Sequence, residues 1–255
     1  MTTDQPIDLS GASIVRADFS GARIRASDFR GVTMRAVDLD GLDVDDHDLQ
    51  FGRLVVNGVD VVPLVEAELD RRFPGRALQH ATTPEGLREG WVAVQDAWAE
   101  TVDGTPAELR DVQVDGEWSL VQTLRHLVLA TDAWLRGGVH GEEQPFHEIG
   151  LPFSGAGQMG FDMSVFRDGA AGDVSYEEVL EVRADRQKRV TAFLADTTPA
   201  LLADPRSNPW NPSDDWAPTV GDCIRVILEE EWAHLRYLRR DLATLAVTTA
   251  DDPEA

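Results

Sequence analysis

Residues 224–243 read IRVILEEEWAHLRYLRRDLA, and this stretch combines the pattern of a long helix with a cluster of ionisable side chains. Large apolar residues recur three or four positions apart, which is the spacing of one face of an α-helix. The pattern predicts a helix over about residues 219–246. Its apolar face consists of Ile224, Ile227, Leu228, Leu235, Leu238, Leu242 and Leu245.

The same periodicity predicts three more long helices before this one. They lie at about residues 84–103, 119–137 and 176–196. Ser119 is a suitable N-cap for the second of them. Residues 139–174 form a long irregular connection that contains His140 and His147, and such a connection is typical of a lid, a site wall or a mobile segment. Four helices with long connections predict a four-helix bundle.

Glu230 and His234 lie four residues apart in the last predicted helix, so their side chains share one helix face. A carboxylate oxygen and an imidazole nitrogen suit Zn²⁺ or another divalent ion. His126, in the interior of the second long helix, is the candidate for a third ligand, and three protein ligands leave one position for water or substrate. Spacing alone leaves open the alternative that both histidines are ordinary hydrogen-bonded helix residues. A di-iron centre is not favoured, because it needs two Glu-x-x-His motifs and only Glu231 and His234 form one.

Residues 117–135, EWSLVQTLRHLVLATDAWL, resemble the second helix of the DinB-like superfamily, whose histidine is its first metal ligand. Residues 224–243 resemble the final, metal-binding helix of that superfamily. The resemblance covers about residues 84–246 and implies a four-helix bundle that holds a divalent metal with three side chains. Many members carry three histidines, whereas the branch of mycothiol-dependent maleylpyruvate isomerase uses His, Glu and His. By this resemblance, the metal ligands are His126, Glu230 and His234.

The implied activity is that of a metal-dependent transferase or isomerase. It activates a low-molecular-weight thiol such as mycothiol for S-transfer, or for thiol-assisted isomerisation, with a small electrophile as the second substrate. Zn²⁺ is the expected metal, with nickel and iron as alternatives. His147 is a candidate base or substrate contact, and Cys223 a candidate for the site lining; the alternatives are an exposed loop histidine and a small buried side chain. Gln122, four residues before His126, is a candidate to orient its imidazole.

Two other functions stay open at this point. The bundle can be a metal-stabilised scaffold without enzymatic activity, in which case the N-terminal part binds a protein partner. It can also be a metal-dependent hydrolase, in which the ion activates water and no thiol is needed.

The N-terminal sixty residues have a period of five. Eleven successive large apolar residues stand five positions apart, from Leu9 to Val59, and a small or modest residue stands two positions before most of them. His47 and Gly52 interrupt that second pattern. A five-residue period suits neither a helix nor a strand, but it resembles the pentapeptide-repeat family, a right-handed square β-helix that buries its apolar side chains in a column.

The expected organisation therefore combines a short right-handed pentapeptide-repeat β-helix with a DinB-like four-helix bundle. The expected segments are the β-helix at residues 6–61, a connecting helix and linker at 62–83, the bundle at 84–246 and a tail at 247–255. The β-helix can be a structural cap or a DNA mimic. Residues 1–61 carry only −5 of the net charge of −23, which favours the cap because a DNA mimic would concentrate the acidic residues.

The composition limits the partners of the protein. The 255 residues are 42% hydrophobic, and a net charge of −23 would repel nucleic acid and anionic lipid. We therefore expect neither nucleic acid nor membrane as a partner, and a homodimer is conceivable only by analogy with such folds. A single cysteine, an N-terminus without a basic, apolar leader and no long apolar run together predict a cytoplasmic location.

Overall fold

The computed structural model describes residues 7–167, 174–209 and 216–251, and the chain divides into two units, residues 1–45 and 46–255. The described part of the first unit is a chain of turns that repeat every ten residues. The N–H groups of Ala12, Ala22, Val32 and Leu42 donate to carbonyls three residues earlier, at 2.9–3.1 Å. A glycine with φ near +70° precedes each of these residues, a conformation that side chains disfavour. An aspartate at the start of each turn accepts an N–H two residues further on, as Asp8 does from Ser10.

The predicted apolar column is not formed in the first unit. No strand is present within residues 7–45, and the large apolar side chains from Leu9 to Val44 in the five-residue series are 41–63% exposed. The prediction of a buried β-helix is thus not supported by the structure, although its turns follow the repeat. The physical reason is that a narrow coil buries its side chains only against neighbouring coils, and each turn here is closed by its own local hydrogen bonds.

The second unit begins with short elements. They are η1 (Leu49–Phe51), β1 (Val55–Val56), β2 (Val59–Asp60), α1 (Val62–Arg72) and η2 (Arg76–His80). The connecting helix, α1, lies within residues 62–83 as predicted, whereas the five-residue period did not predict the others. β1 and β2 pair as an antiparallel hairpin with Val55 opposite Asp60. Its two-residue turn is Asn57-Gly58, both with positive φ, which is the strongest short hairpin signal. The continuation of the repeat to residue 61 was therefore wrong at the hairpin.

The four long helices lie where the sequence predicts them. They are α2 (Pro84–Gly104), α3 (Leu120–Thr131), α4 (Tyr176–Ala195) and α6 (Val220–Asp251). α2 and α4 begin at hydroxyl N-caps, and α3 begins with a reciprocal capping box in which Ser119 and Gln122 each bond the other's backbone N–H. α6 continues to Asp251, five residues beyond the predicted end.

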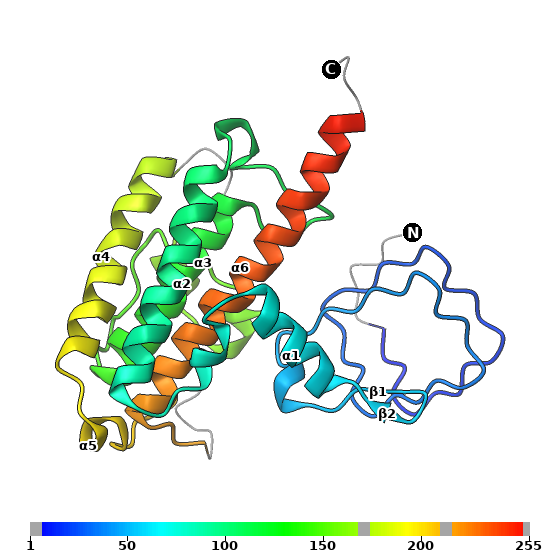
Figure 1. The fold of residues 1–255 in the computed structure, drawn as a ribbon, viewed down its shortest axis with the longest axis horizontal. Helices are drawn as coiled ribbons and strands as arrows, with labels where there is room; N and C mark the ends of the chain where they lie inside the picture. The colour runs from blue at the N-terminus through cyan, green and yellow to red at the C-terminus, as the bar shows by residue number, and fades with distance from the viewer. Residues whose placement is uncertain (1–6, 168–173, 210–215, 252–255) are drawn as a thin grey trace. The chain divides into compact units, whose positions relative to one another are not determined.

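The long helices pack as a bundle in which α2 and α3 each contact both α4 and α6 (Figure 1). The space between them is filled by aliphatic and indole side chains, among them the fully buried Leu87, Val94 and Trp98 of α2 and Leu228 and Leu235 of α6. These residues occupy the apolar faces that the helical periodicity predicted. Burial of these faces is the main force that holds the four helices together.

The predicted helix 119–137 consists of two parts. After Thr131 the backbone widens into a π-helix, η4 (Asp132–Val139). π-helical turns are rare and often occur beside functional sites. Gly138 suits the close approach of η4 to α6, because a Cβ at this position would lie 3.2 Å from the Sγ of Cys223, tighter than an ordinary van der Waals contact.

The irregular connection after η4 contains two short 3-10 turns, η5 (Ala156–Met159) and η6 (Met163–Val165), and α4 is followed by the short α5 (Pro199–Leu202). A further 3-10 turn, η3 (Ala107–Leu109), precedes α3. The first half of the connection is held on α3 by Arg125, whose Nε donates to the carbonyl of Ile149 at 2.9 Å, while the N–H of Leu151 donates back to the Arg125 carbonyl at 3.2 Å. This segment therefore lies directly beside His126.

Candidate metal centre

His126 is placed in the bundle interior by α3, and a backbone group fixes its ring. Its side chain is only 6% exposed. The Nδ1 atom lies 3.0 Å from the carbonyl oxygen of Leu151. Because a carbonyl can only accept, Nδ1 must carry the proton, and Nε2 is left with a free lone pair. This is the second hydrogen bond that metal-binding histidines usually make.

Glu230 and His234 face His126 from one side of α6. The Oε2 atom of Glu230 lies 3.2 Å from Nε2 of His234 and 3.5 Å from Nε2 of His126. One ligand atom from each of the three residues lies within 4.8 Å of the others. The four-residue spacing predicted from the sequence thus places both α6 side chains on one face, and the packing of α3 against α6 adds the third.

The surroundings set the protonation state of this group. Burial raises the pKa of Glu230, but the adjacent imidazoles of His126 and His234 outweigh this effect and hold that pKa well below its usual range. Burial lowers the pKa of His234 to about 4, despite the opposing effect of Glu230. At neutral pH the site therefore offers an ionised carboxylate and an uncharged imidazole.

Aromatic side chains enclose the two imidazoles. The Trp118 ring lies 4.5 Å from that of His126 and 5.6 Å from that of His234, centroid to centroid. The Tyr237 ring lies 5.7 Å from that of His234. The sequence predicted a site role for neither residue, because a tryptophan just before a helix and a tyrosine three residues after His234 have no distinctive spacing.

Gln122 and His147, the candidates for orienting His126 and for proton transfer, make their hydrogen bonds to other groups. The side chain of Gln122 caps α3, and the group that orients the His126 ring is the Leu151 carbonyl. The prediction that Gln122 orients His126 was therefore wrong. The backbone N–H of His147 donates to Oδ2 of Asp132 at 2.8 Å, and its Nδ1 accepts from the N–H of Ile149 at 3.2 Å. Within the described residues, no hydrogen bond, ion pair or ring contact joins His147 to the three clustered side chains.

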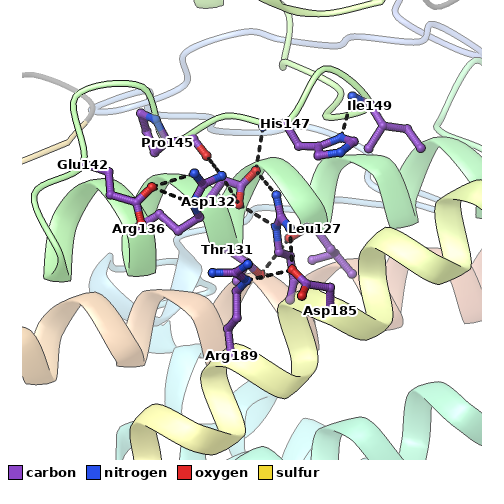
Figure 2. Close-up of polar contacts among 11 residues, drawn as sticks. Leu127, Thr131, Asp132, Arg136, Glu142, Pro145, His147, Ile149, Asp185 and Arg189 are labelled. Atoms are coloured by element: carbon purple, nitrogen blue, oxygen red, sulfur yellow. Dashed lines mark hydrogen bonds and ion pairs between the residues drawn. The ribbon is translucent and has the colours of Figure 1, made fainter.

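The fully buried Asp132 explains the position of His147 (Figure 2). Its carboxylate accepts hydrogen bonds from Arg186 of α4 at 2.7 and 3.2 Å. Arg136, one turn along η4, lies 3.6 Å from the same carboxylate and also donates to the carbonyl of Pro145. Asp132 therefore ties η4, α4 and the start of the irregular connection together, and His147 is part of that structural network.

Cys223 is fully buried in α6, and burial raises the pKa of its thiol to about 12. A thiol with that pKa is ionised in about one molecule in 10⁵ at pH 7. We therefore assign no nucleophilic role to Cys223. Native protein treated with iodoacetamide should stay unlabelled at Cys223, whereas protein unfolded in denaturant should label fully, as measured by mass spectrometry. Equal labelling rates in the two states would contradict this burial.

The three clustered residues suit a divalent cation. Two imidazoles and one carboxylate form a donor set that zinc and similar ions accept, and three protein ligands leave a position open. An uncharged imidazole and an ionised carboxylate are also the forms that bind a cation. Among the described residues this is the one cluster of three or more such groups with its ligand atoms so close together.

Comparison with known families agrees with this architecture. The family model of the DinB superfamily matches residues 87–238, and the model of pentapeptide repeats matches residues 7–41 with eight copies. The chain therefore belongs to the DinB superfamily, whose members are often metal-dependent enzymes. Searches of curated proteins and of solved structures found no match. The family match does not distinguish the mycothiol-dependent branch, so that assignment stays a prediction.

No helix among the described residues combines the length and apolar character needed to cross a bilayer. The cytoplasmic location stays a prediction.

Proposed function

We propose that this protein is a metal-dependent enzyme that activates a low-molecular-weight thiol for transfer to, or isomerisation of, a small electrophile. The observation that carries the proposal is the meeting of His126, Glu230 and His234 within 4.8 Å on two helices of a DinB-superfamily domain. Zn²⁺ is the metal that this donor set favours, and mycothiol is the thiol that the His, Glu, His set suggests.

The role of each residue follows from its contacts. His126 presents Nε2 because Leu151 holds the proton on Nδ1. Glu230 contributes the single negative charge, so a divalent ion would keep a net charge of +1 and attract an anionic ligand. A divalent ion bound there would lower the pKa of a coordinating thiol and make it a thiolate at neutral pH. Trp118 and Tyr237 border His234, whose side chain is 12% exposed.

The chain itself cannot supply the sulfur. Its single cysteine, Cys223, is buried and protonated. Any thiol chemistry at this centre therefore needs a free thiol as co-substrate.

The direct test is an activity assay with a separate thiol and electrophile. Zinc-loaded protein is mixed with mycothiol, or with N-acetylcysteine as a simpler probe, and with 1-chloro-2,4-dinitrobenzene. We expect turnover that requires both thiol and metal, and its loss in Glu230→Gln with an unchanged circular dichroism spectrum. Glu181→Gln, an equivalent change on the exposed side of α4, should retain activity.

Other outcomes of this assay identify the alternatives. Hydrolysis of ester substrates by the zinc-loaded protein without any thiol would indicate a hydrolase. Unfolding of the bundle on metal removal, with no turnover under any condition, would indicate a metal-stabilised scaffold.

A further inference from the structure

His47 is a fourth side chain with metal-site chemistry close to the three clustered residues. Its ring centroid lies 6.3 Å from that of His234, with the two planes at 45°. His47 precedes the segment that the DinB model matches and follows the pentapeptide match. In the sequence His47 is marked only as a break in the five-residue pattern.

Local contacts hold the segment that carries His47 against the helical unit. Asp46 accepts the N–H of Asp48 at 2.9 Å, and the carbonyl of Asp48 accepts the N–H of Phe51 at 2.9 Å, which starts η1. Gln50 then accepts a hydrogen bond from Gln79 of η2 at 3.3 Å. These bonds fix the backbone around His47, and its own side chain is exposed.

The separation of the rings decides what His47 can do. Two imidazoles bound to one tetrahedral ion have ring centres about 5 Å apart, from the usual metal–nitrogen distance of about 2 Å. The ring centroids of His126 and His234 are 4.7 Å apart, which satisfies this condition. The centroids of His47 and His234 are 6.3 Å apart, more than an ångström too far. Within the described residues His47 is also not a member of the group whose ligand atoms lie within 4.8 Å. It is therefore too far away to be a ligand and close enough to contact a group bound on the ion.

We propose that His47 hydrogen-bonds the small ligand that occupies the open position of the ion held by His126, Glu230 and His234. A neutral imidazole has one donor and one acceptor nitrogen, so it can donate to an anion or a thiolate and accept from water. The inference rests on the metal centre of the proposed function. It means that the segment before the DinB domain completes the substrate site, so the domain alone lacks a residue that binds the reacting ligand.

The test uses the full chain loaded with Co²⁺, whose visible absorption reports ligand exchange, and azide as the probe anion. Wild type, His47→Ala, His47→Gln and His140→Ala are titrated, His140 being an exposed histidine on the connection after η4. We expect His47→Ala to raise the Kd for azide about tenfold, the effect of losing one hydrogen bond to a charged group. The Kd of His47→Gln, which keeps a hydrogen-bond donor, should lie between those of wild type and His47→Ala. The Kd of His140→Ala should equal that of wild type. All four proteins should bind Co²⁺ with similar affinity.

Three results would overturn the inference. Equal azide affinity in wild type and His47→Ala would show that His47 does not contact the ligand, while leaving the metal centre intact. Loss of Co²⁺ from His47→Ala, as severe as from His126→Ala, would make His47 a metal ligand instead. Wild type that takes up no Co²⁺ would refute the metal centre of the proposed function and this inference with it.

Discussion

Natively purified wild-type protein is expected to contain about one divalent ion per chain, and the His126→Ala and His234→Ala variants to contain none. Mutating a residue that hydrogen-bonds a metal ligand weakens metal affinity about 10- to 100-fold. Removing a ligand itself should weaken the affinity by more than that. Elemental analysis of the three proteins measures the occupancy directly. Zn²⁺ titration of the metal-free forms gives the affinities.

The pKa values of the site add a pH dependence to this prediction. Protons compete with a cation for both His234 and Glu230, and burial has lowered the pKa of His234 to about 4. The site is therefore ready for an ion at neutral pH. Metal occupancy should stay constant from pH 8 to pH 6 and fall as the pH approaches 4, where His234 becomes protonated.

His140→Ala is the matched control for both histidine variants, because it removes an exposed imidazole that lies outside the cluster. It should keep the wild-type metal content. Full occupancy in His126→Ala or in His234→Ala would refute the assignment of that residue as a ligand. Metal-free wild type that folds and takes up no Zn²⁺ would refute the centre as a whole.

The Glu231→Ala variant should lose about 3–5 kcal/mol of the free energy of unfolding, the usual cost of breaking a buried ion pair. Glu231 is 1% exposed and pairs with Arg183 of α4, which is 3% exposed. Arg183 has no other hydrogen bond among the described residues at Nε or Nη1, so the variant leaves a buried guanidinium without its counter-charge. Urea denaturation of metal-free protein measures the change, because Glu231 is adjacent to Glu230 and metal loss would otherwise contribute.

Two controls separate the ion pair from other effects. The double variant Arg183→Met/Glu231→Leu replaces both charges by apolar side chains and should recover most of the lost stability. Glu100→Ala removes the exposed partner of Arg239 and should change the stability far less. A double variant as unstable as Glu231→Ala would show that packing around Glu231, and not the stranded charge, causes the loss.

The sequence was sufficient where structure depends on near neighbours in the chain. The apolar periodicity located α2, α4 and α6, because helical hydrogen bonds join residues four apart and the apolar face must then be buried. The four-residue spacing of Glu230 and His234 placed both on one face for the same reason. The N-cap of α3 was readable from Ser119.

Local patterns also misled in two places. The five-residue period described the turns of residues 7–45 but not the burial of their apolar side chains, because burial requires contact with other coils. The five-residue period also hid the hairpin at residues 55–60. The apolar spacing there fits both a coil and two short strands, and the Asn-Gly turn decides in favour of the strands.

The sequence by itself determined the helices, the turn repeat and the pair of candidate ligands on α6. The sequence and its family resemblance also named His126 as the third candidate, but only the tertiary structure brought it beside them. The tertiary structure alone added the Leu151 carbonyl that orients His126, the Trp118 and Tyr237 rings, and His47 from the segment before the bundle. These groups come from separate elements, and no repeating spacing in the chain marks them. Their meeting depends on how the helices pack and where the connections lie, which is set by burial and hydrogen bonding across the whole bundle.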